Sequence, residues 1–354
     1  MNKEMSLYLD VLRFTAAMTV FLGHASGKLT GGFLWQLNDY LSASVMIFFV
    51  LSGYVIGFVC DTKEQTIKDY SVARVSRLSS VVVPAILLTI IFDYIGVQIN
   101  PDLYYGGPWP EPQFDVINYV LSLFLLQNIW GMNLNPGINA MFWSLSYELM
   151  FYIIFAVAFY FKGIKRFAFV AIAIAISGPD IVLYFPIWLL GLMAYHLTKN
   201  THKILEKSRF FLPTLFILSA LVLIILTPYI ENNFHYTPDI MITNKNILAD
   251  YIYAIIFTIN LIAAPSILPL FSPVLKVLGK YIVSSASLTF SLYLFHRPLI
   301  QFFATFNSET PDSLVNRITV IGGTILVTIV IGHWAENQKH TIKRYINKLI
   351  VRLS

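Results

Sequence analysis

Apolar runs of roughly 17–25 residues recur along the whole of this chain, and they constrain its fold more than any other feature. Each run is long enough to cross the ~30 Å hydrocarbon core of a bilayer as a helix. Hydrophobic residues make up 57% of the 354 residues and charged residues only 12%, which is too apolar for a water-soluble chain. The sequence therefore predicts an all-α, polytopic integral membrane protein.

About ten runs meet this criterion, and one further stretch has an ambiguous pattern. The spanning segments are expected near 7–26, 41–60, 79–98, 142–161, 165–178, 180–197, 210–230, 249–268, 284–305 and 316–334. The stretch 115–130 (DVINYVLSLFLLQNIW) is apolar enough to be an eleventh.

The distribution of lysine and arginine favours ten spans over eleven. With ten spans and both termini in the cytoplasm, only four loop cations fall outside: Lys28, Lys245, Arg297 and Arg317. An eleventh crossing at 115–130 would turn the basic loop 162–166 (KGIKR) outward and reverse every later loop, against the positive-inside rule. We therefore expect 115–130 to form a re-entrant or interfacial helix.

Other features of the sequence exclude several classes of protein. The single Cys60 rules out an intrachain disulfide. A net charge of +5 is, in such a chain, typical of cytoplasmic loops rather than of nucleic-acid binding. Asp10 and Arg13 interrupt the first apolar run, so it does not resemble a cleaved signal peptide. No charge-rich linker or repeat divides residues 1–354, and we expect one transmembrane domain with no appended soluble domain.

The first expected span carries the ionisable residues Asp10, Arg13 and His24. Eleven residues turn a helix by about 1100°, roughly 20° past three turns, so Arg13 and His24 share one face about 16 Å apart. Asp10 lies three residues before Arg13 and can pair with it. Simple neutralisation of Arg13 by Asp10, with His24 at the interface, is one interpretation. A functional role is the other, because intramembrane charges are costly to desolvate. Spacing alone leaves both open.

Five short blocks follow one another along most of the chain. They are Leu9-Asp10 with Arg13, ten residues and His24; FFVLSGYVIG (48–57); Arg74-x-x-Arg77-Leu78; FWSLSYELMFY (142–152); and SLYLFHRPLI (291–300). Together they resemble the membrane proteins of acyltransferase family 3. The chain departs from the family's pattern at Phe14, where Gly is common, at Leu149, where a second Glu is common, and after Leu78, where no Pro follows closely.

The resemblance implies transfer of an acyl group, usually acetyl from cytoplasmic acetyl-CoA, to a hydroxyl of an extracytoplasmic carbohydrate such as a cell-surface polysaccharide. It also implies a bacterial cytoplasmic (inner) membrane. The expected partners are acyl-CoA, the carbohydrate acceptor and the lipid bilayer, with no nucleic acid. Succinyl or longer acyl groups stay open as alternatives to acetyl. The sequences of the outer loops do not indicate which glycan is the acceptor.

Three arginines are candidates for binding the donor. Arg74 and Arg77 stand at i and i+3 in an expected cytoplasmic segment, where two forked guanidinium groups can bind the phosphates of coenzyme A. Arg13 would line a polar channel and contact the donor's polar groups. The alternative is that Arg74 and Arg77 are ordinary positive-inside anchors.

The candidate catalytic residues are His24 and Glu148. An imidazole with an unperturbed pKa near 6.5 can accept a hydroxyl proton at neutral pH. His24 could deprotonate the acceptor sugar for direct attack on the thioester, or first become acylated itself. Direct attack is preferred because it needs no covalent intermediate. Glu148 would orient the imidazole, or bind sugar hydroxyls beside an aromatic platform of Trp143 and Tyr147. His296 is expected to contribute to the acceptor site, with a role as a helix-end anchor equally open.

Neither metal nor ATP chemistry is supported by the sequence, because it has no His-x-x-x-His motif, no cysteine pair and no Walker-type loop. A second functional class is a secondary transporter or flippase for a glycan or lipid-linked substrate. Arg13, His24 and Glu148 would then form a substrate or proton path. Such proteins often contain internal repeats, and none is visible between residues 1–175 and 180–354.

Overall fold

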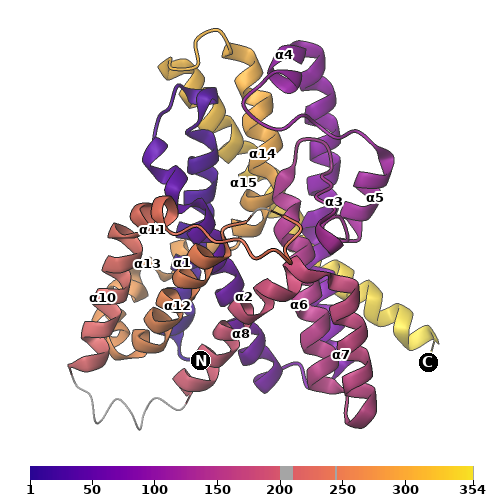
Figure 1. Cartoon of the computed structure of the whole chain (residues 1–354), viewed down its shortest axis with the longest axis vertical. Coiled ribbons are helices and arrows are strands. Elements are labelled where there is room, and N and C mark those ends of the chain that lie inside the picture. Colours follow the sequence, from indigo (N-terminus) through magenta and orange to yellow (C-terminus); the bar gives the residue numbers. More distant parts are fainter. Residues whose placement is uncertain (200–209, 244, 354) are drawn as a thin grey trace. The chain divides into compact units, whose positions relative to one another are not determined.

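The computed structural model describes residues 1–199, 210–243 and 245–353, and this part of the chain is mostly helical (Figure 1). It contains no strand, and one isolated bridge pairs Gln113 with Gly137. The residues form two compact units. Unit 1 comprises 1–16, 39–65 and 177–286, and unit 2 comprises 17–38, 66–176 and 287–354. The basic loop residues Lys203, Lys207 and Arg209, which the ten-span topology places in the cytoplasm, lie outside the described residues together with His202.

Unit 1 is built from six helices and the first part of a seventh within its described residues. The first part of α1 (Lys3–Ala25) belongs to it. The others are α2 (Leu41–Thr62), α8 (Pro179–Lys199), α10 (Phe211–Ile225), α11 (Thr227–Asn233), α12 (Ile247–Ala263) and α13 (Ser272–Ala286).

Unit 2 contains the end of α1 and the remaining described helices. These are α3 (Ile67–Ile99), α4 (Pro101–Tyr105), α5 (Val116–Leu123), α6 (Trp143–Tyr160), α7 (Gly163–Ser177), α14 (Thr289–Ala304) and α15 (Leu314–Leu353), joined by short 3-10 turns. Its core is the packed set of α3, α14 and α15 (Figure 1).

The described residues include seven helices that are long and apolar enough to cross a membrane, or up to nine if each of two bent pairs forms one span. The seven are Lys3–Ala25, Trp35–Thr62, Ile67–Ile99, Ala140–Tyr160, Pro179–Lys199, Ile247–Ser266 and Leu314–Arg352. The bent pairs are Phe211–Ile225 with Thr227–Asn233, and Leu268–Ala286 with Thr289–Asn307. The fold class is therefore a polytopic, all-α membrane protein, as expected.

One segment explains the difference between the ten expected spans and the upper count of nine. The run expected at 165–178 forms α7, whose 15 residues extend about 22 Å and fall short of the ~30 Å core. The stretch 115–130 forms only the eight-residue α5 and a turn with positive φ at Leu125 and Trp130. As expected, 115–130 does not form a spanning helix.

Within unit 1, α2 and α8 approach so closely that glycine is required at the contact. A Cβ atom at Gly53 would lie 2.0 Å from the carbonyl oxygen of Trp188. A Cβ atom at Gly191 would lie 1.9 Å from that of Val50. Small residues allow such close approach between membrane helices, where dispersion contacts rather than the hydrophobic effect hold the pair together.

A polar cluster also lies inside unit 1. Asp250, 3% exposed, accepts hydrogen bonds from the hydroxyls of Ser42 and Tyr184. Lys245, in the loop before α12, has its ammonium 5.6 Å from the Tyr184 ring centre. Burial lowers the pKa of Lys245 to about 7, although the nearby carboxylates of Asp250 and Asp180 act in the opposite direction. These interactions join α2, α8, α12 and the loop before α12.

In unit 2, polar contacts gather the ends of several helices in one region. Asn100 caps α4 by accepting from the Leu103 backbone N–H at 3.0 Å, and its amide donates to the Ser308 hydroxyl at 2.9 Å. Gln301 of α14 donates to the Leu103 carbonyl at 2.7 Å. Asn316 of α15 donates to the carbonyl of Leu29, just after α1, at 2.8 Å. The last turns of α1, α3 and α14 and the first turn of α15 are therefore neighbours.

Candidate functional site

Two histidines from opposite ends of the sequence form the centre of the candidate site. His24 lies in the last turn of α1 and His296 in α14, both in unit 2. Nδ1 of His24 is 3.0 Å from Nε2 of His296, and the rings are stacked with 5.2 Å between centroids. His296 is fully buried, whereas His24 is half-buried. A substrate can therefore reach only the first of the two.

The hydrogen bonds of His296 fix the proton positions of the pair. Its Nδ1 lies 2.9 Å from the backbone carbonyl of Leu292, and because a carbonyl only accepts, this nitrogen carries the hydrogen. In the neutral ring, Nε2 then has the lone pair and accepts from Nδ1–H of His24. This assignment leaves Nε2 of His24 with its own lone pair, as a general base requires.

Aromatic side chains enclose the histidine pair. Phe21 of α1 and Tyr293 of α14 both meet the His296 ring edge-on, with centroid separations of 6.2 Å. The Tyr293 hydroxyl is 2.8 Å from the Ser144 hydroxyl, at the start of α6. The surroundings of His296 are thus apolar, with one polar connection to α6.

The loop 106–140 is held against the same region by the buried Asp93, a candidate acceptor contact on the sequence alone. The Asp93 carboxylate is fully buried and accepts from the Ile138 backbone N–H at 2.9 Å. Gly137 has a φ of +56°, and a Cβ atom there would lie 2.2 Å from that carboxylate. Asn139 donates to the Leu294 carbonyl on α14 at 2.8 Å. Glycine at position 137 therefore permits both the positive φ and this tight approach.

Arg297, next to His296, is also buried, with 4% of its surface exposed. Its guanidinium carbon lies 3.1 Å from the centre of the Trp109 ring, which belongs to the same loop. From the sequence alone, Arg297 is expected among the outer-loop cations. Its side chain is instead covered by an indole ring inside unit 2.

A second polar cluster lies around the expected donor-binding residues, on α3 and α6. Arg74 is 8% exposed, and its guanidinium lies 5.2 Å from the Tyr70 ring centre and 5.6 Å from that of Tyr152. Arg77, one turn on, is exposed and acts electrostatically on Tyr152. The Tyr152 hydroxyl donates to the Glu148 carboxylate. The structure therefore brings Arg74, Arg77 and Glu148 together through Tyr152.

The remaining expected site residues have different environments. Trp143 is half-buried and meets Tyr147 edge-on at 5.2 Å. Tyr147 is only 1% exposed, so in this structure it packs inside unit 2 and offers no open platform. Arg13 lies in the part of α1 that belongs to unit 1 and pairs with Asp10 at 3.4 Å, as its spacing indicated. No group of three or more metal-binding side chains occurs among the described residues.

Comparison with known proteins gives two matches. A family model described as an acyltransferase domain matches residues 6–333, nearly the whole chain. An O-acetyl transferase of Shigella phage Sf6 is 26% identical over 197 residues, which cover 51% of this chain and 56% of the phage protein. The chain thus matches a little over half the length of that relative. No solved structure matches the chain.

Proposed function

The chain belongs to acyltransferase family 3, and from this premise we propose that it moves an acetyl group from cytoplasmic acetyl-CoA to a hydroxyl of an extracytoplasmic carbohydrate. The phage relative named as an O-acetyl transferase supports an O-linked acetyl product. The single structural observation that carries the proposal is the hydrogen bond between His24 and His296, because it prepares one accessible imidazole nitrogen for general base catalysis.

In the proposed reaction, Nε2 of His24 takes the proton of the acceptor hydroxyl as its oxygen attacks the thioester carbonyl. The tetrahedral intermediate then collapses, the bond from carbon to sulfur breaks, and the imidazolium returns the proton to the coenzyme A thiolate. The products are an acetyl ester and free coenzyme A. His296 accepts the hydrogen bond from Nδ1–H of His24 throughout, and so keeps the base in one tautomer and one orientation.

A route through an acylated His24 stays open beside direct attack. In that route, Nε2 of His24 attacks the thioester first, and the acceptor oxygen then attacks the acyl-imidazole. Direct attack is the simpler proposal because both substrates can meet at one half-buried nitrogen. Single-turnover mixing of protein with labelled acetyl-CoA, without acceptor, distinguishes the routes by whether label stays on the protein.

The cluster of Arg74, Arg77, Tyr152 and Glu148 is proposed to bind the donor. Arg74 is buried between two tyrosine rings, which is unlike a basic anchor extending to the membrane surface. Guanidinium groups at i and i+3 suit the phosphates of coenzyme A. Tyr293, whose ring meets His296 edge-on, also interacts electrostatically with Glu148 of this cluster. This connection favours a donor path between α6 and α14, while Arg13 as a channel residue stays a prediction.

Replacing Arg74 and Arg77 together with alanine should weaken acetyl-CoA binding by about tenfold or more, because each charge-assisted hydrogen bond contributes roughly 1.5–3 kcal/mol. The remaining affinity should also depend less on salt, since phosphate contacts are electrostatic. Titration calorimetry with acetyl-CoA at several salt concentrations measures both effects. Lys165→Ala, which removes an exposed cation from another loop, is the matched control. An unchanged affinity in the double variant would return the two arginines to the anchor interpretation.

The acyl transfer itself is tested with purified, detergent-solubilised protein, labelled acetyl-CoA and envelope glycans extracted from the bacterial host. The proposal expects label to appear in the glycan as an alkali-labile ester, with release of one coenzyme A per ester. Mass spectrometry of the glycan locates the modified hydroxyl. Transport of a glycan across vesicles without any acetyl transfer would overturn the proposal in favour of a transporter.

The proposed location is the cytoplasmic membrane of a bacterium, with both termini in the cytoplasm. The distribution of basic loop residues supports this orientation. It places the Arg74 and Arg77 cluster on the donor side and the histidine pair in the outer half of the membrane.

A further inference from the structure

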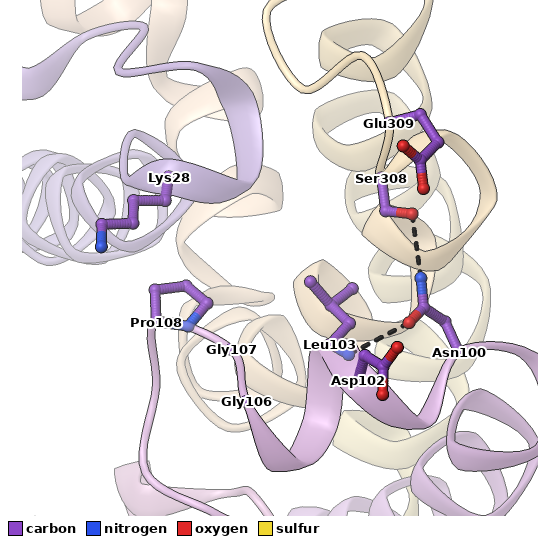
Figure 2. A pocket seen from close by; sticks show the side chains of 9 residues that line it. All are labelled: Lys28, Asn100, Asp102, Leu103, Gly106, Gly107, Pro108, Ser308 and Glu309. Carbon is purple, nitrogen blue, oxygen red and sulfur yellow. Dashed lines mark hydrogen bonds between the residues drawn. The ribbon is translucent and has the colours of Figure 1, made fainter.

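A polar pocket lies in unit 2 where the ends of α1, α3 and α14 meet. It has a volume of about 380 Å³, within the range of about 300–1,000 Å³ typical of small-molecule sites. Figure 2 shows Lys28 and Pro108 on one side of it, and Asn100, Asp102, Ser308 and Glu309 on the other. The pocket therefore has a basic wall and an acidic wall.

The hydrogen bonds that hold the acidic wall do not involve the carboxylates of Asp102 and Glu309. Asn100 joins the two segments of this wall, since its amide donates to the Ser308 hydroxyl and its oxygen accepts from the Leu103 backbone (Figure 2). Within the described part of the chain, no hydrogen bond or ion pair involves the side chains of Lys28, Asp102 or Glu309. Three exposed charged groups are therefore available to a ligand.

The arrangement of these charges selects among ligands. The carboxylates of Asp102 and Glu309 can only accept hydrogen bonds, and the ammonium of Lys28 can only donate. A hydroxyl group does both, so a ligand with several hydroxyls can satisfy both walls at once. A sugar carboxylate or phosphate would pair with Lys28 but would face two like charges, and a sugar ammonium would pair with the carboxylates but would face the like charge of Lys28. The side chain of Leu103 adds an apolar surface for the C–H groups of a sugar ring.

We infer that this pocket, between Lys28 on one side and Asp102 and Glu309 on the other, is a subsite for a neutral sugar unit of the acceptor glycan. The inference rests on the proposed function and adds to it both a class of acceptor and a place where the acceptor is held. The pocket is separate from the reacting atoms. Lys28 follows His24 by four residues, and Gln301, which bonds to Leu103, follows His296 by five.

A subsite at this position holds a sugar unit that does not react. Five residues of helix correspond to about 7.5 Å along α14, so Gln301, whose amide donates to the carbonyl of the pocket residue Leu103, lies within two turns of His296. Binding energy from a remote part of a substrate can position the reacting hydroxyl at the base. The subsite thus favours oligosaccharides over single sugars.

The test uses a glycan array of neutral, uronic acid-containing and amino sugar-containing oligosaccharides, probed with labelled, purified full-length protein. The wild type should retain neutral oligosaccharides, and the double variant Asp102→Asn with Glu309→Gln should lose about tenfold or more of that binding. Glu111→Gln removes an exposed carboxylate on the same loop but outside the pocket, and is the matched control. Acetyl-CoA affinity should be equal in all three proteins, which checks their folding.

Three results would overturn the subsite. They are no retained glycan, equal retention by wild type and double variant, or retention of only acidic glycans in a manner abolished by Lys28→Ala. An acetyl-transfer assay on the same preparations separates this inference from the proposed function. Pocket-dependent binding without transfer retains the subsite and overturns the transferase proposal. Acetyl transfer that is equal in the wild type and the double variant retains the transferase proposal and overturns the subsite.

Discussion

Replacing His24 with alanine is expected to lower the rate of acyl transfer by about 10²–10⁴-fold, the usual effect of removing a general base. The physical reason is that His24 is the half-buried member of the histidine pair, and its Nε2 has the lone pair that takes the hydroxyl proton. Membrane insertion and acetyl-CoA binding should persist, because His24 lies in the last turn of α1. Transfer of labelled acetyl, normalised to the amount of folded protein, measures the effect.

Substitutions of His296 show whether it acts by positioning His24. His296→Leu removes the acceptor for Nδ1–H of His24, and kcat should fall while the KM for acetyl-CoA stays near its original value. His296→Gln restores an acceptor oxygen and should recover part of the rate. His333→Ala, at an exposed histidine on α15, is the control and should be fully active. Normal turnover by a well-folded His24→Ala protein would remove the pair from the mechanism.

Gly191→Ala is expected to cost about 1–3 kcal/mol of stability, without any change to a candidate catalytic residue. The added methyl group would lie 1.9 Å from the Val50 carbonyl oxygen, so α2 and α8 would have to separate. Backbone atoms cannot rotate away as a side chain can. Thermal unfolding in detergent, followed by size-exclusion chromatography, should show a clear decrease in the midpoint.

Gly322→Ala provides the matched control on α15. The nearest atom to a Cβ there is 4.0 Å away, on the Ile318 side chain, so the methyl group has room. Alanine also favours helix by about 1 kcal/mol over glycine. This variant should be as stable as the wild type or more stable. If both alanine variants behaved alike, the close contact of α2 and α8 would not be a determinant of stability.

Local physics explains which features could be predicted from the sequence. In hydrocarbon an apolar run must satisfy its backbone hydrogen bonds internally, and a helix does so. The expected runs from 7–26 to 316–334 are accordingly helical in the structure. Helical periodicity placed Asp10 beside Arg13, and their side chains pair at 3.4 Å. The same reasoning put Arg74 and Arg77 one turn apart. The run at 165–178 shows its limit, because an apolar pattern indicates a helix but not whether α7, at 15 residues, is long enough to cross.

Only the tertiary structure decided which residues meet. His24 and His296 are 272 positions apart in the sequence. A pattern of apolar and polar residues indicates which face of a helix is buried, but it does not indicate which other helix covers that face. His296, expected at the acceptor site, became the partner of the candidate base, while Glu148 accepts from Tyr152. The pocket around Asn100 depends in the same way on three helix ends brought together from distant parts of the chain. Sequence spacing determines neighbours within a helix, whereas neighbours across helices follow from packing, which depends on every contacting side chain at once.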